Sequence, residues 1–288
     1  MRICRFDGDR FGLVEGNDVR DVTSAFGSLP QQSYPFPRTD LMIANLATLR
    51  PAIEAAARNA PVLALDSLKL LSPIANPGKI VAAPVNYKKH LDEARGDAEI
   101  HHQNQVGEIQ RVGLFLKATS SVVGCGEGVA MRHMDRRNDH EIELAVVIGE
   151  TADRVSHDDA LNYVAGYCIG LDMTIRGPEE RSLRKSVDTF TVLGPYFVTA
   201  DEIGDPAGLD LELTVDGEKR QLANTRDLIL DVKTLISWAS SFYTLHPGDV
   251  ILTGTPEGVG PVLPGNTIRA TIARIGTMEV AVRQLPPR

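Results

Sequence analysis

The sequence lacks paired cysteine motifs, long apolar runs and an excess of basic residues, and each absence excludes a class of protein. The three cysteines, Cys4, Cys125 and Cys168, form no CxxC pair and are odd in number, which predicts free core thiols in a reducing, cytoplasmic environment. No stretch approaches the roughly 18 apolar residues that a membrane span needs. The segment MRICRFDGDR at residues 1–10 also lacks the apolar stretch of a signal peptide.

Basic residues are too few for a general nucleic-acid binder. The 38 Asp and Glu residues outnumber the 30 Lys and Arg residues, which leaves a formal net charge of −8. A net anion repels nucleic acid and anionic membrane surfaces, so neither is expected as a partner. The hydrophobic fraction of 43% and the 288-residue length are ordinary for a soluble globular protein with a sizeable core.

Composition divides the chain into two parts. Alternating apolar residues at 2–6 and 11–14 predict strands, and apolar residues at 3–4 spacing over 41–59 predict a helix. Turn residues cluster just after this first part. We therefore expect a small N-terminal α+β domain (residues 1–71) followed by a second domain (residues 72–288).

The second part is predicted to be rich in strands. Two helices stand out, over residues 158–164, with Ser156 as the N-cap, and over residues 231–243. Many short strands with few helices favour a β-rich α+β fold over a doubly wound sheet. The predicted strands are residues 80–84, 114–117, 141–148, 167–172, 196–199, 211–215, 250–253, 268–272 and 278–282.

A polar, glycine-punctuated segment, residues 92–112, interrupts these strands. Connections of this length in a compact domain are often active-site lids. We expect a lid loop here and interpret His101 and His102 as solvated loop residues, with contact to a substrate as the alternative.

Carboxylates cluster on two predicted strands. Glu141 and Glu143 are two residues apart, so their side chains share one face of a strand, and the apolar run after them predicts burial. Asp172 ends a second apolar strand. Adjacent buried carboxylates repel one another, and a divalent cation such as Mg²⁺, Mn²⁺ or Ca²⁺ would resolve the conflict through oxygen ligands. The alternative is that Glu141 pairs with Arg136 or Arg137, and that Asp172 is a turn residue.

A histidine and a glutamate follow the strand at residues 80–84. His90 and Glu93 lie one helical turn apart, and a carboxylate beside an imidazole fixes its tautomer and raises its basicity. The pair therefore has the chemistry of a general base that activates water. The alternative is a solvated helix face.

A glycine-rich loop follows the strand at residues 250–253. Its backbone amides and the Thr255 hydroxyl could hold an anion. The loop lacks the Gly-Lys-Ser/Thr signature of a phosphate loop, and Pro256 removes an amide donor. A carboxylate is therefore a better candidate ligand than a phosphate.

Taken in order, these segments resemble the fumarylacetoacetate hydrolase superfamily. The resemblance covers about residues 79–283, and residues 1–71 resemble the small N-terminal domain of bacterial two-domain members. It implies a mixed β-sandwich or roll and a homodimer. The motifs that carry it are NYKKH with Glu93, LFLK, HEIELAVVIG, YCIGLDMTIR, RKSVDTF, LGP, PGDVILTGTPEGVG and IARIGTMEV.

The resemblance also assigns the catalytic and metal-binding residues. It implies that Mg²⁺ or Mn²⁺ is held by Glu141, Glu143 and Asp172. It further implies that His90, oriented by Glu93 on a short lid helix, is the base. Lys185 matches the family lysine that neutralises an enolate or a substrate oxygen.

Substrate contacts follow from the same resemblance. Thr255 matches the threonine that holds a substrate carboxylate, and Tyr87 belongs to the first motif. Arg176 and Lys117 match positions near the site, although Arg176 could instead brace a loop and Lys117 could pair with an acid. Glu179 stands where the family commonly has an amide that contacts the substrate.

Two further departures from the family pattern are present. His140 replaces a common tyrosine before the first metal-binding glutamate, and the segment with His101 and His102 is longer than in compact relatives.

The expected reaction is hydrolytic cleavage of a C–C bond in an acylpyruvate or similar β-diketo acid, as in aromatic-compound catabolism. The alternative enzymes are an oxaloacetate decarboxylase or a hydroxymuconate-type isomerase that uses the same metal site. A non-catalytic binding protein on the same scaffold is a third hypothesis, disfavoured because the six catalytic and metal-binding residues are all present.

Overall fold

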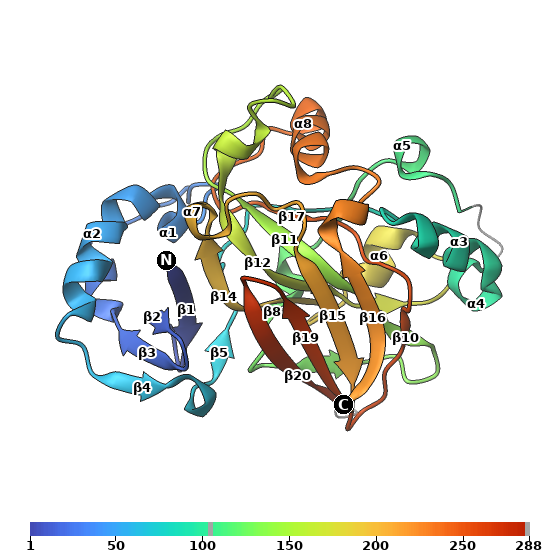
Figure 1. Cartoon of the computed structure of the whole chain (residues 1–288), viewed down its shortest axis with the longest axis horizontal. Helices are drawn as coiled ribbons and strands as arrows, with labels where there is room; N and C mark the ends of the chain where they lie inside the picture. Colours follow the sequence, from blue (N-terminus) through green and yellow to red (C-terminus); the bar gives the residue numbers. More distant parts are fainter. Residues whose placement is uncertain (103–105, 286–288) are drawn as a thin grey trace.

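The computed structural model describes residues 1–102 and 106–285, and a 12-stranded sheet forms its centre (Figure 1). Two short strands, β5 (Leu70–Leu71) and β8 (Val122–Gly124), pair with β1 and β14 beside the main path. The main path runs β4 (Val62–Ala64), β3 (Asp18–Asp21), β2 (Arg10–Glu15), β1 (Arg2–Phe6), β14 (Thr191–Thr199), β12 (Val164–Asp172), β11 (Ile142–Ile148), β17 (Val250–Leu252), β6 (Ile80–Ala82) and β7 (Phe115–Lys117).

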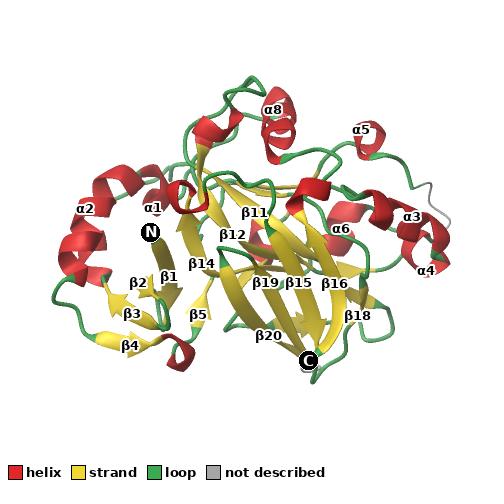
Figure 2. Cartoon of the chain, viewed as in Figure 1, coloured by secondary structure: helices red, strands yellow, loops and turns green. Residues whose placement is uncertain are grey.

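Two smaller sheets accompany the large one, and Figure 2 shows the strands gathered at the centre with helices around them. A five-stranded sheet has the order β16 (Glu218–Asn224), β15 (Asp210–Val215), β19 (Thr267–Ile272), β20 (Gly276–Gln284) and β9 (Val129–Met131). A three-stranded sheet has the order β13 (Thr174–Ile175), β10 (Asn138–His140) and β18 (Gly260–Pro261).

Strand β11 is buried on both faces. Its residues Ile142, Leu144 and Val146 join a core that includes side chains of the five-stranded sheet. Ala145 and Val147 join a second core with side chains of the N-terminal helices. The molecule is therefore a layered, β-rich α+β fold, as the sequence predicts.

The N-terminal strands extend the large sheet, because β1 pairs antiparallel with β14 and Arg2 lies opposite Val198. The helix predicted over residues 41–59 is two helices, α1 (Leu41–Ala44) and α2 (Leu46–Ala57). Asn45 separates them, with its side-chain amide donating to the Leu41 carbonyl at 2.8 Å. The domain boundary after residue 71 stays a prediction.

The predicted lid segment, residues 92–112, is not a plain loop. It contains the end of α3 (Lys88–Gly96), then α4 (Ala98–His101) and α5 (Ile109–Val112); residues 103–105 lie outside the described residues. The Asp97 side chain caps α4 by accepting from the Glu99 amide at 2.8 Å. Ala94 and Ile100 pack against Val259, so short-range capping and a small apolar cluster order this polar segment.

The remaining helices are α6 (Arg181–Lys185), α7 (Ala200–Ile203) and α8 (Val232–Phe242), and Asp231 caps α8. The helix predicted over residues 158–164 is wrong: only a 3₁₀ turn, Ala160–Tyr163, forms, because β12 already begins at Val164. Other 3₁₀ turns are Thr23–Ser28, Leu65–Ser67, Thr119–Ser121 and Thr225–Asp227.

The expectation of free core thiols is confirmed, since Cys4, Cys125 and Cys168 are all unpaired and buried. Burial raises the pKa of the Cys125 thiol to about 11. Within residues 1–102 and 106–285, no helix has both the length and the apolar character required to cross a membrane.

Candidate metal centre and active site

Three buried carboxylates meet where β11 and β12 lie side by side. Glu143 is in β11, Glu141 is the residue directly before the first residue of β11, and Asp172 is the last residue of β12. The antiparallel pairing sets Ile142 opposite Leu171, which brings the ends of the two strands together. The nearest ligand oxygens of the three carboxylates lie within 4.8 Å of one another. We call these residues the carboxylate trio.

The electrostatics of the trio favour a bound cation. Burial, and next the charge of Asp172, raise the pKa of Glu143 well above its usual value. Burial also opposes ionisation of Glu141, but the charges of Lys185 and Arg176 outweigh it and lower the pKa of Glu141 to about 2. A divalent ion would let all three carboxylates ionise together, so the donor set fits a divalent metal.

Two buried lysines orient the trio. Lys185 Nζ lies 2.5 Å from Glu141 Oε2, 2.7 Å from Asp172 Oδ2 and 2.6 Å from Thr174 Oγ1. Lys117 Nζ donates to Asp172 and, at 2.9 Å, to the Phe190 carbonyl. Burial lowers the pKa of Lys117. Both lysines therefore hold Asp172 from separate sides, as one of the two interpretations of Lys117 predicts.

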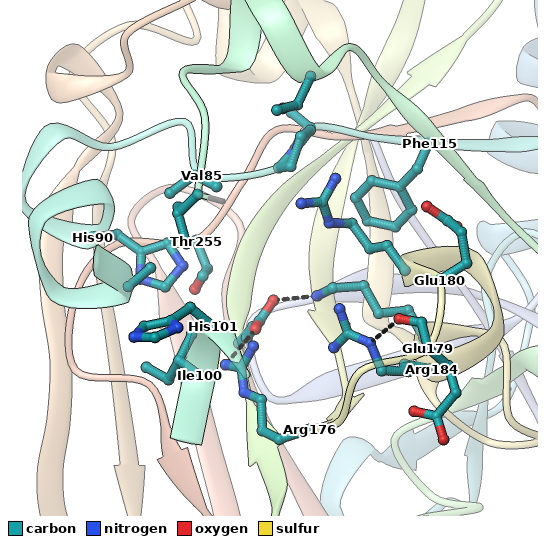
Figure 3. Close-up of a pocket in the computed structure, with 18 of the residues that line it drawn as sticks. Val85, His90, Ile100, His101, Phe115, Arg176, Glu179, Glu180, Arg184 and Thr255 are labelled. Carbon is teal, nitrogen blue, oxygen red and sulfur yellow. Dashed lines mark hydrogen bonds and ion pairs between the residues drawn. The ribbon is translucent and has the colours of Figure 1, made fainter. Parts of the chain in front are cut away.

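A cavity of about 520 Å³ opens onto the trio. Glu141, Glu143 and Lys185 line its floor, and α3 contributes His90 to its wall. Figure 3 shows His90, His101 and Thr255 on one side of the cavity and Phe115 and Glu180 on the other. The structure thus brings the predicted base and the predicted metal ligands to one space.

The histidine–glutamate pair forms as the sequence predicts. His90 Nδ1 lies 2.8 Å from Glu93 Oε2, and the Gly258 amide donates to Glu93 Oε1 at 2.9 Å. The glycine-rich loop thereby fixes Glu93, and Glu93 fixes the imidazole with its other ring nitrogen available to the cavity.

The same glycine-rich loop reaches the trio directly. The Gly254 amide donates to Glu143 Oε2 at 2.6 Å, and Thr255 lines the cavity. Gln221 Nε2 donates to Thr255 Oγ1 at 2.8 Å, which leaves the threonine hydroxyl hydrogen for another acceptor. Gln221 is a buried side chain on β16 that no sequence motif marks as part of the site.

Arg176 both braces the trio and lines the cavity. Its Nε donates to Asp139 Oδ2 at 2.8 Å and its Nη2 to Glu141 Oε1 at 2.9 Å. The alternative partners proposed for Glu141 are wrong. Arg136 pairs with Glu179 at 2.7 Å, and Arg137 pairs with Asp139 at 2.8 Å.

Glu179 lines the cavity with its carboxylate already engaged. Arg136 donates to both oxygens, at 3.0 and 2.7 Å, and these hydrogen bonds lower the pKa of Glu179. His140 is buried away from the cavity, with its Nδ1 3.2 Å from Gln221 Oε1.

Two predicted substrate-binding residues are not part of the cavity wall. Tyr87 and Lys117 are buried behind it, so their contact with a substrate stays a prediction. The interpretation of the lid histidines as solvated residues is wrong. His101 ends α4 and lines the cavity, and His102, in the left-handed conformation (φ 45°), has a buried Nε2; both residues are half-buried.

Two arginines of α6, Arg181 and Arg184, also line the cavity, and neither is predicted as a site residue from the sequence. The signal that could have found them is the spacing of Arg184 and Lys185, three and four residues after Arg181 on one helix.

A layered β-rich fold with a buried carboxylate trio, a histidine–glutamate pair and a cationic cavity defines a metal-dependent enzyme acting on small acids. The family model described as "Fumarylacetoacetate (FAA) hydrolase C-terminal" matches residues 79–283. The chain belongs to the fumarylacetoacetate hydrolase family and is a hydrolase, which confirms the resemblance found in the sequence.

Relatives match over the full length of the chain. It is 56% identical to a maleylpyruvate hydrolase of Aquipseudomonas alcaligenes, over 99% of this chain and 100% of that protein. It is 34% identical to the mitochondrial oxaloacetate tautomerase FAHD2A of Homo sapiens, over 96% of this chain and 90% of that protein. A crystal structure of maleylpyruvate hydrolase from Sphingobium sp. SYK-6 in complex with manganese(II) and pyruvate matches with a TM-score of 0.83 and 42% sequence identity. The match covers 99% of this chain and 100% of that one.

Proposed function

We propose that the protein hydrolyses a C–C bond in an acylpyruvate of the maleylpyruvate type, releasing pyruvate and the corresponding acid. The observation that carries the proposal is that one cavity is lined by Glu141 and Glu143 of the carboxylate trio and by His90, whose Nδ1 lies 2.8 Å from Glu93 Oε2. The full-length similarity to maleylpyruvate hydrolases, one of them in complex with manganese(II) and pyruvate, supports it.

The trio would hold the metal, which we propose to be Mg²⁺ or Mn²⁺. When bound, a divalent ion supplies electrophilic stabilisation to the 2-oxo acid end of the substrate. Glu141 and Asp172 are oriented for this task by Lys185, and Glu143 by the Gly254 amide. Ca²⁺ accepts the same oxygen ligands and is the third candidate.

The chain's own residues supply the proton chemistry. His90 takes a proton from water, and the resulting imidazolium is stabilised by Glu93. The water oxygen attacks the acyl carbonyl, the C–C bond to the pyruvate methylene breaks, and the electron pair passes to the pyruvate enolate. The proton held by His90 then returns to the enolate carbon, which completes pyruvate and restores the base. Lys185 lies beside the trio and offsets the negative charge of that enolate. The Thr255 hydroxyl holds the substrate carboxylate.

A second candidate is enolisation of a 2-oxo acid without attack by water, as in oxaloacetate decarboxylation or tautomerisation or hydroxymuconate-type isomerisation. The similarity of the chain to an oxaloacetate tautomerase supports this second candidate. The trio serves either reaction, whereas His90 with its fixed tautomer is needed most for hydrolysis.

A product assay separates the two candidates. We expect the Mn²⁺-loaded protein to convert maleylpyruvate into equimolar pyruvate and maleate, measured by lactate dehydrogenase coupling and chromatography, and a chelator to stop the reaction. Oxaloacetate is expected to turn over at least about 100-fold more slowly, because loss of the acyl contacts removes transition-state binding. Faster turnover of oxaloacetate than of maleylpyruvate would reverse the assignment.

A homodimer in the cytoplasm is proposed on the resemblance and the composition alone. Light scattering after size-exclusion chromatography tests the dimer, and a mass of one chain, 31.3 kDa, would contradict it.

A further inference from the structure

Helix α6 presents three cationic side chains to the cavity. Arg181, Arg184 and Lys185 are spaced i, i+3 and i+4, so they share one side of the helix, and all three line the cavity. Lys185 is engaged by the carboxylate trio at 2.5 and 2.7 Å. Arg181 begins the helix and Arg184 directly precedes Lys185, and neither arginine forms an ion pair with a carboxylate among the residues that the structure describes.

The Arg181 guanidinium is held in place without a polar partner among the described residues. Its Cζ lies 5.6 Å from the centroid of the Phe115 ring, and Lys185 Nζ lies 5.6 Å from the same centroid. The aromatic ring therefore positions Arg181 beside Lys185 while leaving the five N–H donors of the arginine uncommitted.

The neighbouring carboxylates are already engaged elsewhere. Glu179 accepts from Arg136 at 2.7 and 3.0 Å. Glu180 accepts from the Ser182 amide at 2.9 Å as the cap of α6. Neither carboxylate lies within ion-pair distance of Arg181, so this end of the cavity keeps an excess of positive charge.

Arg184 adds to that excess and also orders the wall. Its Nε donates to the Glu179 carbonyl at 2.8 Å and its Nη1 to the Ile175 carbonyl at 3.2 Å, contacts to neutral groups that leave its charge uncompensated. Figure 3 shows Arg184 on the same side of the cavity as Phe115 and Glu180, across from His90.

We propose that Arg181, with Arg184 beside it, binds a second carboxylate at the distal end of the acyl group, which makes the enzyme selective for dicarboxylic acylpyruvates. This inference rests on the proposed function, which places the 2-oxo acid end at the trio and Lys185. One helical turn separates Lys185 from Arg181, about 5–6 Å between their Cβ atoms, so an acyl chain that runs along α6 reaches Arg181. The planar guanidinium matches a carboxylate in a bidentate pair.

Binding of two non-cleavable acids tests the subsite. 2-Oxoheptanedioate has the carbon chain length of maleylpyruvate, and 2-oxoheptanoate lacks only the distal carboxylate; neither has the second carbonyl that hydrolysis requires. Calorimetry with the Mn²⁺-loaded protein is expected to show tighter binding of the diacid. Arg181→Gln is expected to weaken binding of the diacid by roughly 30-fold, the loss of one charge-assisted contact, and that of the monoacid by less than about twofold.

Arg132→Gln is the matched control. It removes the same charge from an exposed ion pair with Asp188 and lies outside the cavity wall, so both affinities should stay unchanged. Equal weakening of both acids by Arg181→Gln would show a structural role, and an unchanged affinity for the diacid would show no contact; either result overturns the subsite. Failure of the wild-type protein to bind either acid would overturn the proposed function and this inference with it.

Discussion

Replacing His90 with alanine is expected to lower kcat for maleylpyruvate cleavage by about 10³-fold, within the range that a positioned general base contributes. His90 lines the cavity, and its Nδ1 lies 2.8 Å from Glu93 Oε2. Among the described residues, no hydrogen bond or ion pair joins His90 to the carboxylate trio. The Mn²⁺ affinity of the variant should therefore stay within about threefold of the wild-type value. Steady-state kinetics and calorimetry measure the two quantities.

His157→Ala is the matched control for this variant. His157 also lies beside carboxylates, 3.3 Å from Asp158 and 3.7 Å from Asp231, but it is exposed and outside the cavity of the trio. Its replacement should leave kcat unchanged. A His90→Ala protein that keeps near-full activity with bound Mn²⁺ would mean that another group activates the water.

Replacing Glu143 with glutamine is expected to weaken Mn²⁺ binding by more than roughly 100-fold. Loss of a residue that only supports a metal ligand lowers metal affinity by about 10- to 100-fold, and loss of a ligand itself should lower it further. Turnover at fixed Mn²⁺ should fall by about 10³-fold with it. Glutamine keeps the shape of the side chain but replaces one carboxylate oxygen by an NH2 group, so the change removes the charge and one oxygen ligand. Glu150→Gln, an exposed position just after the same strand, is the control and should change neither quantity.

In the metal-free protein, Glu143→Gln is expected to raise the folding stability at high pH. Because burial and Asp172 raise the pKa of Glu143, the folded state holds this proton more tightly than the unfolded chain. The stability that it contributes is present below the ordinary glutamate pKa and is lost as the pH rises through the raised value. Metal-free Glu143→Gln should therefore gain stability over the wild-type protein as the pH rises.

Urea unfolding of both metal-free proteins from about pH 5 to about pH 9 measures that difference. A stability gap that shrinks with rising pH would contradict the assigned cause. Mn²⁺ should remove the gap, because it binds the wild-type trio and stabilises the folded state.

The sequence predicts much of the site because its chemistry follows local periodicity. Glu141 and Glu143 share a strand face by the two-residue repeat, and His90 and Glu93 share a helical turn, so both pairs form as expected. The sequence marks Asp172 as a candidate at the end of a second apolar strand, but its place beside the two glutamates depends on the pairing of β12 with β11, which local periodicity does not predict.

Long-range partners account for what the sequence does not reveal. Gln221 reaches Thr255 from the five-stranded sheet, and the role of Lys117 depends on Asp172, 55 positions away. The choice of Glu179, not Glu141, as the partner of Arg136 depends on the fold of the loop before α6.

Two predicted helices differ from the observed ones because a side-chain hydrogen bond or a strand pairing overrides the apolar pattern of the segment. The apolar pattern of residues 41–59 is helical throughout, yet Asn45 ends α1 by hydrogen bonding to its own preceding turn. The pattern of residues 158–164 is compatible with a helix, but Val164 is drawn into β12, where the gain from sheet pairing is larger.

Titration of the metal-free protein with Mn²⁺, with pyruvate release from maleylpyruvate followed at each addition, tests the central claim most directly. The carboxylate trio predicts no activity without metal and a linear rise that saturates at one ion per chain. Full activity in the metal-free protein, or full Mn²⁺-dependent activity in the Glu143→Gln variant, would contradict the account.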